Sequence, residues 1–443
     1  MTSLWQDVRC GIRMLVKHGL APLGQLAKSE WQLPQDQTRW HSGASFGRQR
    51  WRQFLVIFQF ATAVMLVVSA GLLMVSFWQL QRVDPGFHPD HLISLGLTLP
   101  QSKYSDNTLI NNFYNGVVER ISAIPGVEAA SLGYDHPLQT NWVDSFSVES
   151  QANKAEANSA NFNSVGWDYF RTVGGQILRG RNFSAQDDEN HAGVAIVNEA
   201  FARRYFPDQE VLGRKLRLSA PARLWNNQRL TSFEIVGLSR NVKSSGLTAD
   251  TEPTYYVPST QAPISDMQIL VRTSVDPMAL VPALRNAVWT LDRNQPIAEV
   301  KTLGQVVSDS VQRPRLNMIL MGGFGLIALA LAVLGIYGLL SYAVTQRTQE
   351  MGIRMALGAQ VHDVLKLILK QGIILALIGE GIGLLAALAC TRWLRSLLFG
   401  VGPTDVRIYL AVFFLLIVIA FVACLLPARR ATKVDPLVAL RYE

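Results

Sequence analysis

The chain has 443 residues, enough for two or three domains, and 49% of them are hydrophobic whereas only 17% are charged. This composition is apolar for a soluble protein of that size and indicates a membrane protein. The net charge of +8 is unevenly distributed: residues 79–317 carry 22 Lys and Arg against 24 Asp and Glu, and the rest of the chain carries 19 against 9. A basic excess in the parts that flank apolar runs favours anionic lipid headgroups as its partner and argues against nucleic acid.

The chain begins with a basic amphipathic segment. In residues 1–20 apolar side chains fall on one side of a helix, and Arg9, Arg13 and Lys17 fall on the other, which predicts a helix lying flat on a membrane surface. Charge interrupts the apolar side and no small-residue cleavage site follows, so a signal peptide is not expected. Residues 21–53 contain two prolines and several glutamines, which predicts a cytosolic linker.

Four apolar runs are each long enough to cross a bilayer, which requires roughly 20 residues. Four arginines and no acidic residue lie within residues 39–53, so the positive-inside rule places this end of the first run in the cytoplasm. An even number of spans then puts both termini in the cytoplasm. The predicted transmembrane helices are residues 54–78, 318–344, 371–390 and 408–426, with a cytosolic loop at 345–370, an extracytoplasmic loop at 391–407 and a cytosolic tail at 427–443.

Residues 79–317, between the first and second spans, alternate between strand and helix patterns. Alternating apolar residues predict the strands, and apolar residues spaced three or four apart predict the helices. The predicted fold is therefore a four-helix membrane protein with an α+β extracytoplasmic domain, expected to form two subdomains, inserted after the first helix. The predicted strands are 93–99, 127–132, 145–149, 194–197, 233–238 and 267–272, and the predicted helices are 108–124, a segment through Phe201 and Tyr205, and 277–291.

The loop at 345–370 has helical patterns of its own. Glu350 and Arg354 are four residues apart, a spacing that stabilises a short helix, and Gly358 is placed to end it in a left-handed cap. A second amphipathic pattern follows and continues into the third span. A short helix with apolar positions at a membrane face needs a cover, which is either lipid headgroups or a groove on a soluble partner.

Glu380 lies near the middle of the third span. A carboxylate there costs about 2.5–3.5 kcal/mol on insertion scales, which makes it a functional-site candidate. The alternative is a protonated or paired Glu at a helix contact, because Gly379 and Gly383 give the same span a small-residue face. In the second span, Gly322 and Gly325 also favour close helix packing.

The sequence lacks several motifs that are typical of nucleotide-binding proteins and metalloenzymes. No GxxxxGK[ST] phosphate-binding loop occurs, so ATP, if it is used, is expected on a partner subunit and no bound cofactor is predicted. No HExxH and no paired cysteines occur, and neither a metal site nor an enzyme activity is expected. The cysteines, at positions 10, 390 and 424, exclude a disulfide framework in residues 79–317.

Three segments resemble one known family. EMGIRMALGA in the cytosolic loop, LRSLLFGVGPTD after the third span, and the tail LLPARRATKVDPLVALRYE are similar to FtsX-like permeases, and most similar to the MacB-type branch of ABC permeases. FARRYFPDQEVLGRKLRL resembles the MacB-like periplasmic core domain. The resemblance covers roughly residues 50–443, and it assigns residues 79–317 to that core domain and 318–436 to the FtsX-like permease domain.

The resemblance implies a function in a bacterial inner membrane. The family's cytosolic loop carries a coupling helix that docks on an ABC ATPase, which here implies the residues Glu350, Met351, Gly352, Ile353, Arg354, Ala356 and Gly358. The expected activity is that of a permease subunit that transmits force from a separate ATPase to the periplasmic domain, for export or efflux. A homodimer, or a heterodimer with a second permease, is the expected assembly, with a periplasmic adaptor or outer-membrane channel as a further partner.

Two other interpretations remain open at this stage. In the first, the chain is a non-transporting FtsX-like regulatory or signalling protein that controls an extracytoplasmic partner. In the second, it is a shortened paralogue that needs a second permease chain. The partner of residues 79–317 distinguishes the first of these from an exporter.

Overall fold

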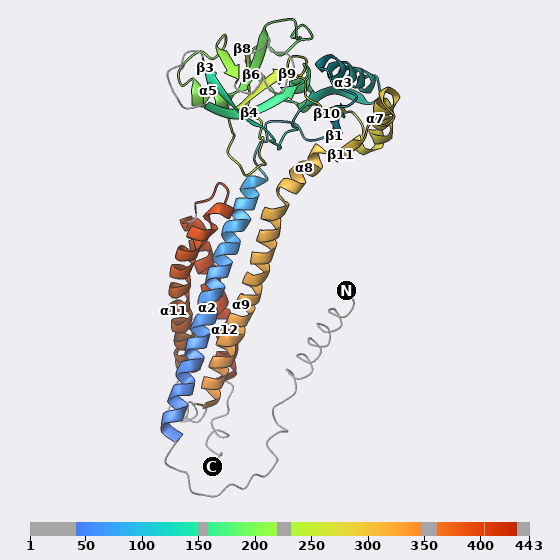
Figure 1. The fold of residues 1–443 in the computed structure, drawn as a ribbon. Helices are drawn as coiled ribbons and strands as arrows, with labels where there is room; N and C mark the ends of the chain where they lie inside the picture. The colour runs from blue at the N-terminus through green and yellow to red at the C-terminus, as the bar shows by residue number, and fades with distance from the viewer. Residues whose placement is uncertain (1–40, 149–157, 219–231, 347–360, 403, 432–443) are drawn as a thin grey trace. The chain divides into compact units, whose positions relative to one another are not determined.

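The chain divides into two compact units, residues 1–55 and residues 56–443. Within the first unit the structure describes only residues 41–55, which form the first turns of a long helix. The second unit contains membrane helices and a folded domain that follows the first of them in the sequence (Figure 1). The structure is a computed structural model, and it describes residues 41–148, 158–218, 232–346, 361–402 and 404–431.

Four helices among the described residues are long and apolar enough to cross a membrane. The shortest has 26 residues, which at 1.5 Å per residue is about 39 Å and exceeds the roughly 30 Å hydrocarbon core of a bilayer. The prediction of four transmembrane helices with a folded domain inserted after the first is confirmed. The four are α2 (His41–Leu80), α9 (Gln312–Gln346), α11 (Val361–Leu394) and α12 (Val406–Ala431).

Each helix extends beyond the apolar run that predicted it. α2 begins at His41, so residues 41–53, which were expected to belong to a linker, are helical. No proline lies between Pro34 and the end of α2, and extending an existing helix costs far less than nucleating a new one. Polar and basic residues therefore continue the helix past the apolar run.

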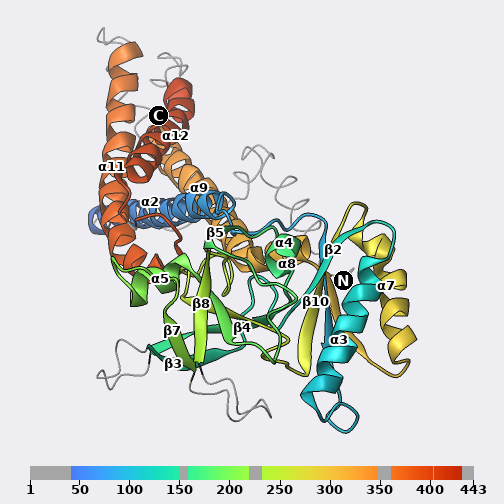
Figure 2. The same cartoon turned by 90° about the horizontal axis from the view of Figure 1, so that it is seen from above.

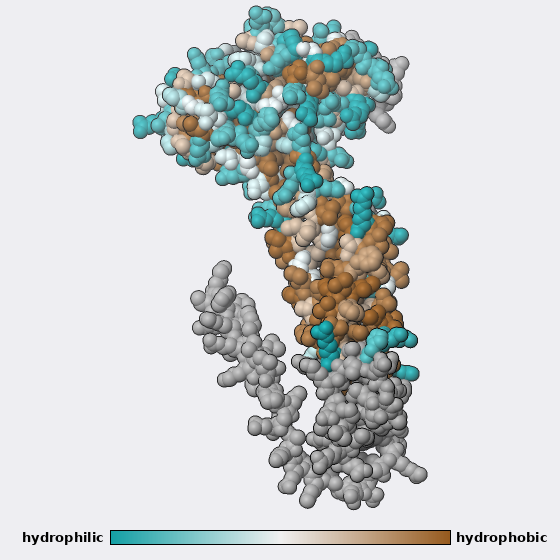
Figure 3. All heavy atoms as spheres, turned by 180° about the vertical axis from the view of Figure 1, so that it is seen from behind, coloured by the Kyte–Doolittle hydropathy of each residue, from teal (hydrophilic) through white to brown (hydrophobic). Residues whose placement is uncertain are grey.

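Apolar side chains from all four helices meet in one buried cluster that includes Phe60, Ile336, Leu375 and Leu416. In the most apolar stretch of α2, 56% of the residues are buried, against 17% in that of α9. α2 therefore lies at the centre of the bundle and α9 at its surface. Figure 3 shows the hydrophobic surface that the helices leave exposed.

One half of the folded domain is a ring of six paired strands. β4 pairs antiparallel with β3 and parallel with β9, and this second pairing closes the ring β4-β3-β7-β8-β6-β9 into a small barrel (Figure 2). Closure leaves the ring without free edges, which protects it from pairing with other chains. The strands are β3 (Val143–Val148), β4 (Asn158–Val165), β6 (Gly193–Asn198), β7 (Lys215–Leu218), β8 (Ser232–Ser239) and β9 (Thr254–Pro258), and β5 (Ile177–Gly180) pairs with β8 beside the ring.

Aromatic side chains fill the barrel. Phe146 of β3 lies 5.0 Å, between ring centroids, from Phe201 of the helix α5 (Glu199–Tyr205), and Tyr255 of β9 lies 6.1 Å from Phe146. All three are fully buried. Asn198 caps α5 by accepting a hydrogen bond from Phe201 N at 2.8 Å, which explains why the helix begins directly after β6.

The other half is a four-stranded antiparallel sheet covered by two helices. Its strand order is β11-β1-β10-β2, and α3 and α7 lie together on one face of it (Figure 2). Asp106 and Asp276 cap the two helices, and α7 has a proline in its first turn, as helix starts favour. The elements are β1 (Leu92–Thr98), α3 (Asn107–Ser122), β2 (Val127–Gly133), β10 (Asp266–Thr273), α7 (Pro277–Leu291), β11 (Ile297–Thr302) and, after the sheet, α8 (Leu303–Ser310).

A narrow junction joins the barrel to the sheet. A single residue pair, Gly133 with Val165, connects β2 to β4. Next to it, the Asn163 side chain accepts a hydrogen bond from Asp135 N and donates one to Asp135 O, both at 3.1 Å. An apolar cluster, which includes residues of the helix α4 (Tyr169–Val173), packs across the junction. The two halves are the two subdomains that the sequence predicted.

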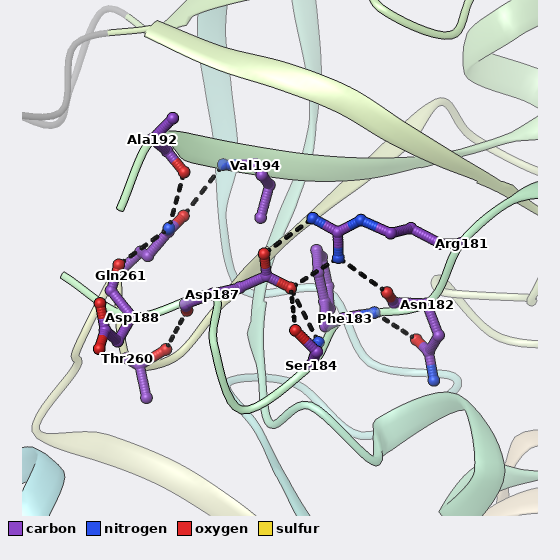
Figure 4. Close-up of polar contacts among 10 residues, drawn as sticks. All are labelled: Arg181, Asn182, Phe183, Ser184, Asp187, Asp188, Ala192, Val194, Thr260 and Gln261. Carbon is purple, nitrogen blue, oxygen red and sulfur yellow. Dashed lines mark hydrogen bonds and ion pairs between the residues drawn. The ribbon is translucent and has the colours of Figure 1, made fainter. Parts of the chain in front are cut away.

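The connection from β5 to β6 is held by side-chain hydrogen bonds (Figure 4). Arg181 donates to both oxygens of Asp187 at 2.8 Å, and Ser184 N donates to the same carboxylate. Burial acts to raise the pKa of Asp187, but the hydrogen bonds from Arg181 and Ser184 outweigh it and hold the pKa below its usual value. The Gln261 amide then bridges the connection to the turn after β9, by accepting from Val194 N and donating to the carbonyls of Asp188 and Ala192.

Candidate functional site

The predicted coupling residues lie in the cytosolic loop, and the segment 347–360 that contains them is outside the described residues. The structure does describe the two helices that bracket this segment. α9 ends at Gln346 and α11 begins at Val361. The site can therefore be described through the helices that lead into it.

One close helix contact in the bundle is between α11 and α2. A Cβ atom at Gly383 would lie 2.6 Å from Val64 Cβ and 2.7 Å from Ala61 O, and one at Gly379 would lie 2.9 Å from Phe60 Cβ. Real Cβ atoms do not approach other atoms so closely, so no larger residue fits either position without movement of a helix. The structure thus places both glycines where α11 meets the backbone of α2.

The two glycines singled out on α9 have different surroundings. A Cβ at Gly325 would lie 3.6 Å from Val67 of α2, which is ordinary van der Waals contact. A Cβ at Gly322 would meet no atom of the described chain within 4 Å. Within this chain, Gly325 therefore faces α2, and Gly322 packs against no other described helix.

Gly372 of α11 is a packing residue that the sequence reasoning missed. A Cβ there would lie 2.5 Å from Cys424 Sγ of α12 and 3.0 Å from Leu340 Cδ1 of α9, so three helices meet at this position. Its signal was present in the sequence, because Gly372 and Ala376 are small residues four apart on one helix face.

Glu380 lies next to the contact between α11 and α2. Glu380 is fully buried, with 0% of its surface exposed. Neither of its carboxylate oxygens has a hydrogen-bond partner among the described residues. Burying a charged or polar group without a partner is costly, and in native structures such a group calls for an explanation. The geometry therefore keeps Glu380 as a candidate for a function inside the bundle.

The described residues contain no group of three or more His, Cys, Asp or Glu side chains that could hold a metal ion. The two histidines that are close in sequence have separate surroundings. His91 Nδ1 lies 3.2 Å from Val275 O, and the His88 ring lies against Gly174.

Comparison with family models gives two matches along the chain. The model described as MacB-like periplasmic core domain matches residues 58–291, and the model described as FtsX-like permease C-terminal matches residues 322–436. The first match alone covers more than half of the chain. The chain belongs to the family of MacB-like ABC permeases with an FtsX-like permease domain, and it is a multi-pass protein of the inner membrane.

Individual relatives agree with the family match. The macrolide export ATP-binding/permease protein MacB of Marinobacter nauticus is 27% identical over 279 residues, which are 60% of this chain and 41% of the relative. MacB of Escherichia coli is 23% identical over 352 residues, which are 75% of this chain and 51% of the relative. The uncharacterised ABC transporter permease YvrN of Bacillus subtilis is 26% identical over 290 residues, 62% of this chain and 68% of the relative. The chain spans about half the length of the MacB proteins it matches.

Solved structures with a similar fold include two outer domains of such transporters. The periplasmic region of MacB from Actinobacillus actinomycetemcomitans has a TM-score of 0.35 and 13% identity, covering 53% of this chain and 98% of that one. The extracellular domain of YknZ, from Gram-positive bacteria, has a TM-score of 0.32 and 13% identity, covering 47% of this chain and 99% of that one.

The first prediction concerns the contact between α11 and α2. We expect Gly383→Val to destabilise the bundle by about 1–3 kcal/mol or more, because overpacking forces the helices apart. Gly381→Val is the matched control, because a Cβ at Gly381 meets no atom of the described chain within 4 Å. Thermal unfolding of both purified variants in one detergent measures the difference. Equal midpoints for the two variants would contradict the observed packing.

The second prediction concerns Glu380. We expect Glu380→Leu to raise the free energy of unfolding by about 1–3 kcal/mol, because it removes a buried polar group that has no partner. Glu380→Gln, which keeps a buried polar group of the same shape, should change stability less. The measurement is again thermal unfolding in detergent. If Glu380→Leu is the less stable of the two variants, the carboxyl group has a stabilising partner and its candidacy as a functional residue is lost.

Proposed function

We propose that this chain is the permease subunit of an ABC transporter that transmits force from an ATPase partner to its own folded domain. The continuity of α9 carries the proposal. This helix is unbroken from Gln312 to Gln346, about 50 Å at 1.5 Å per residue. At one end it follows α8 and β11 of the folded domain, and at the other it leads directly into the predicted coupling residues.

The looser packing of α9 supports a moving role for it. α9 is the least buried of the four membrane helices. Its contact with α2 is ordinary van der Waals contact at Gly325, 3.6 Å, and is close at Gly335, where a Cβ would meet the end of the flexible Gln59 side chain. A helix that makes fewer close contacts loses less packing energy when it shifts, because each close contact contributes attraction that falls steeply with separation. In this proposal α2 and α11 form the fixed part of the bundle, and α9 carries the displacement.

The coupling segment is the proposed docking site for the ATPase. The sequence predicts a short helix there that Glu350 and Arg354 stabilise and Gly358 ends, with apolar residues such as Ile353 available for a groove on the partner. The names of the MacB relatives include ATP binding and macrolide export, and they support an ABC ATPase as the partner and export as the direction of transport. On this proposal both termini are cytoplasmic, and the chain itself need not hydrolyse ATP.

A second permease chain is the proposed partner within the membrane. One exposed side of α9 carries Leu326 one turn from Gly322, which has open space where a Cβ would lie. Small residues on a lipid-facing surface let a second helix approach closely. Two such chains would bring eight helices together around a two-fold axis. A periplasmic adaptor or outer-membrane channel is the proposed partner of the folded domain.

The third prediction tests coupling. We expect Ile353→Asp and Arg354→Glu each to abolish stimulation of the ABC ATPase that co-purifies with the chain, because they place a negative charge on the docking helix. The controls are Val143→Asp, at a side chain of the folded domain that is 62% exposed, and Arg392→Glu, at the other end of α11. ATP hydrolysis by complexes in nanodiscs is the measurement. Wild-type stimulation by both loop variants, with equal membrane insertion, would refute the proposal.

The fourth prediction tests topology. In a chain whose Cys10, Cys390 and Cys424 are replaced by Ala, a single Val143→Cys should react with a membrane-impermeant maleimide on spheroplasts. A single Ile353→Cys should react only after the membrane is permeabilised, because the coupling segment and the folded domain lie on opposite sides. Labelling of both positions from the same side would exclude force transmission across the bilayer.

A further inference from the structure

A polar cavity lies at the junction between the barrel and the sheet. It encloses about 290 Å³, part of which is open to solvent, and its walls come from the connection between β2 and β3, from β4 and β9, from α4 and from the chain after β8. The connection between the subdomains and the barrel both contribute to it. Its polar walls include Asp135, His136, Gln139, Asn161 and Asn163.

Asp135 brings a buried carboxylate to this cavity. The residue is 3% exposed, and its carboxylate accepts hydrogen bonds from Asn141 N at 2.9 Å and from Asn141 Nδ2 at 2.6 Å. No ion pair among the described residues includes it. Burial raises the pKa of Asp135 to about 6, against the opposing effect of the two hydrogen bonds from Asn141. At neutral pH it is therefore mostly an ion without a counter-ion.

Two further acceptors lie on the same connection. Gln139 Oε1 is buried and accepts no hydrogen bond among the described residues. His136 Nδ1 lies 2.7 Å from Pro137 O, a contact that requires a proton on Nδ1 and leaves Nε2 as an acceptor. Burial lowers the pKa of His136, so its ring is neutral at pH 7. The connection thus offers hydrogen-bond acceptors and a negative charge.

Aromatic rings also line the cavity. Phe162, Tyr169 and Tyr256 line the cavity, and the faces of aromatic rings attract positive charge. Lys243 also lines the cavity, and its ammonium group donates a hydrogen bond to the carbonyl oxygen of Ala249. A ligand that supplies several N–H donors and one positive charge would satisfy both Asp135 and Gln139.

We propose that this cavity, the amine cavity, binds a small protonated primary amine, with the ammonium group between Asp135 and Gln139 and its substituent against the aromatic rings. Because residues 135–140 connect the sheet to the barrel, an occupant contacts this connection and the barrel wall together. The proposal stands on the cavity alone and holds whether or not the chain works as a permease.

The fifth prediction tests the amine cavity on the full chain in nanodiscs. Isothermal titration at pH 7.5 should show saturable binding of methylammonium, and at least tenfold weaker binding of tetramethylammonium, which has the same charge but no N–H donor. Binding should weaken about tenfold at pH 5, because a carboxyl group with a pKa of about 6 is then roughly nine-tenths protonated. Ionic strength is kept constant with NaCl throughout.

Variants locate the site. Asp135→Asn should weaken methylammonium binding at least tenfold, and Gln139→Leu several-fold. Asp208→Asn is the matched control, because it removes an exposed carboxylate on a residue with φ of 57°, a conformation that Asn tolerates, and it should bind like the wild type. If Asp135→Asn does not fold, methylammonium binding by Gln139→Leu tests the proposal instead. No binding by the wild-type chain, equal binding of the two cations, or undiminished binding by a folded variant of either cavity residue would overturn the proposal.

Discussion

The structure depends on the close approach of α11 to α2. Lipid tails are as apolar as leucine, so membrane helices associate through packing and not through the release of water. Gly379 and Gly383 allow this packing, because a side chain at either position would collide with Phe60 or with the backbone at Ala61. α2 also touches α12 at Gly71, where a Cβ would lie 3.2 Å from an atom of Ile408. The helix that leads into the folded domain is thus also the most buried helix of the bundle.

Three residues of the described chain bury a side-chain oxygen without a partner: Glu380, Gln139 and Gln295. Natural proteins satisfy nearly all buried polar groups, and the exceptions concentrate at functional sites. Glu380 lies inside the bundle, and Gln139 lies on the connection between the two subdomains.

The sequence predicted the elements that have a strong apolar period and missed those that do not. The expected segments 93–99, 127–132 and 267–272 correspond to β1, β2 and β10, whose apolar residues face the core. β4 was missed because its sequence, NSANFNSV, is rich in Asn and Ser. Two of its three asparagines are nevertheless buried, since Asn161 donates to Glu252 and Asn163 pairs with the backbone of Asp135. Those partners are distant in sequence, so no local pattern could have shown that the strand exists.

Length, composition and periodicity alone determined the membrane class, the four spans and the inserted α+β domain, because burial in lipid requires long apolar runs whatever the tertiary contacts are. Local motifs also indicated the family, and through it the predicted coupling residues, which lie outside the described part of the chain. Only the tertiary structure decided that the barrel closes through β4 and β9, that α2 is central, and that Asp135 and Gln139 share a cavity. These features depend on contacts between segments far apart in the chain. A single sequence does not show which distant residues are in contact.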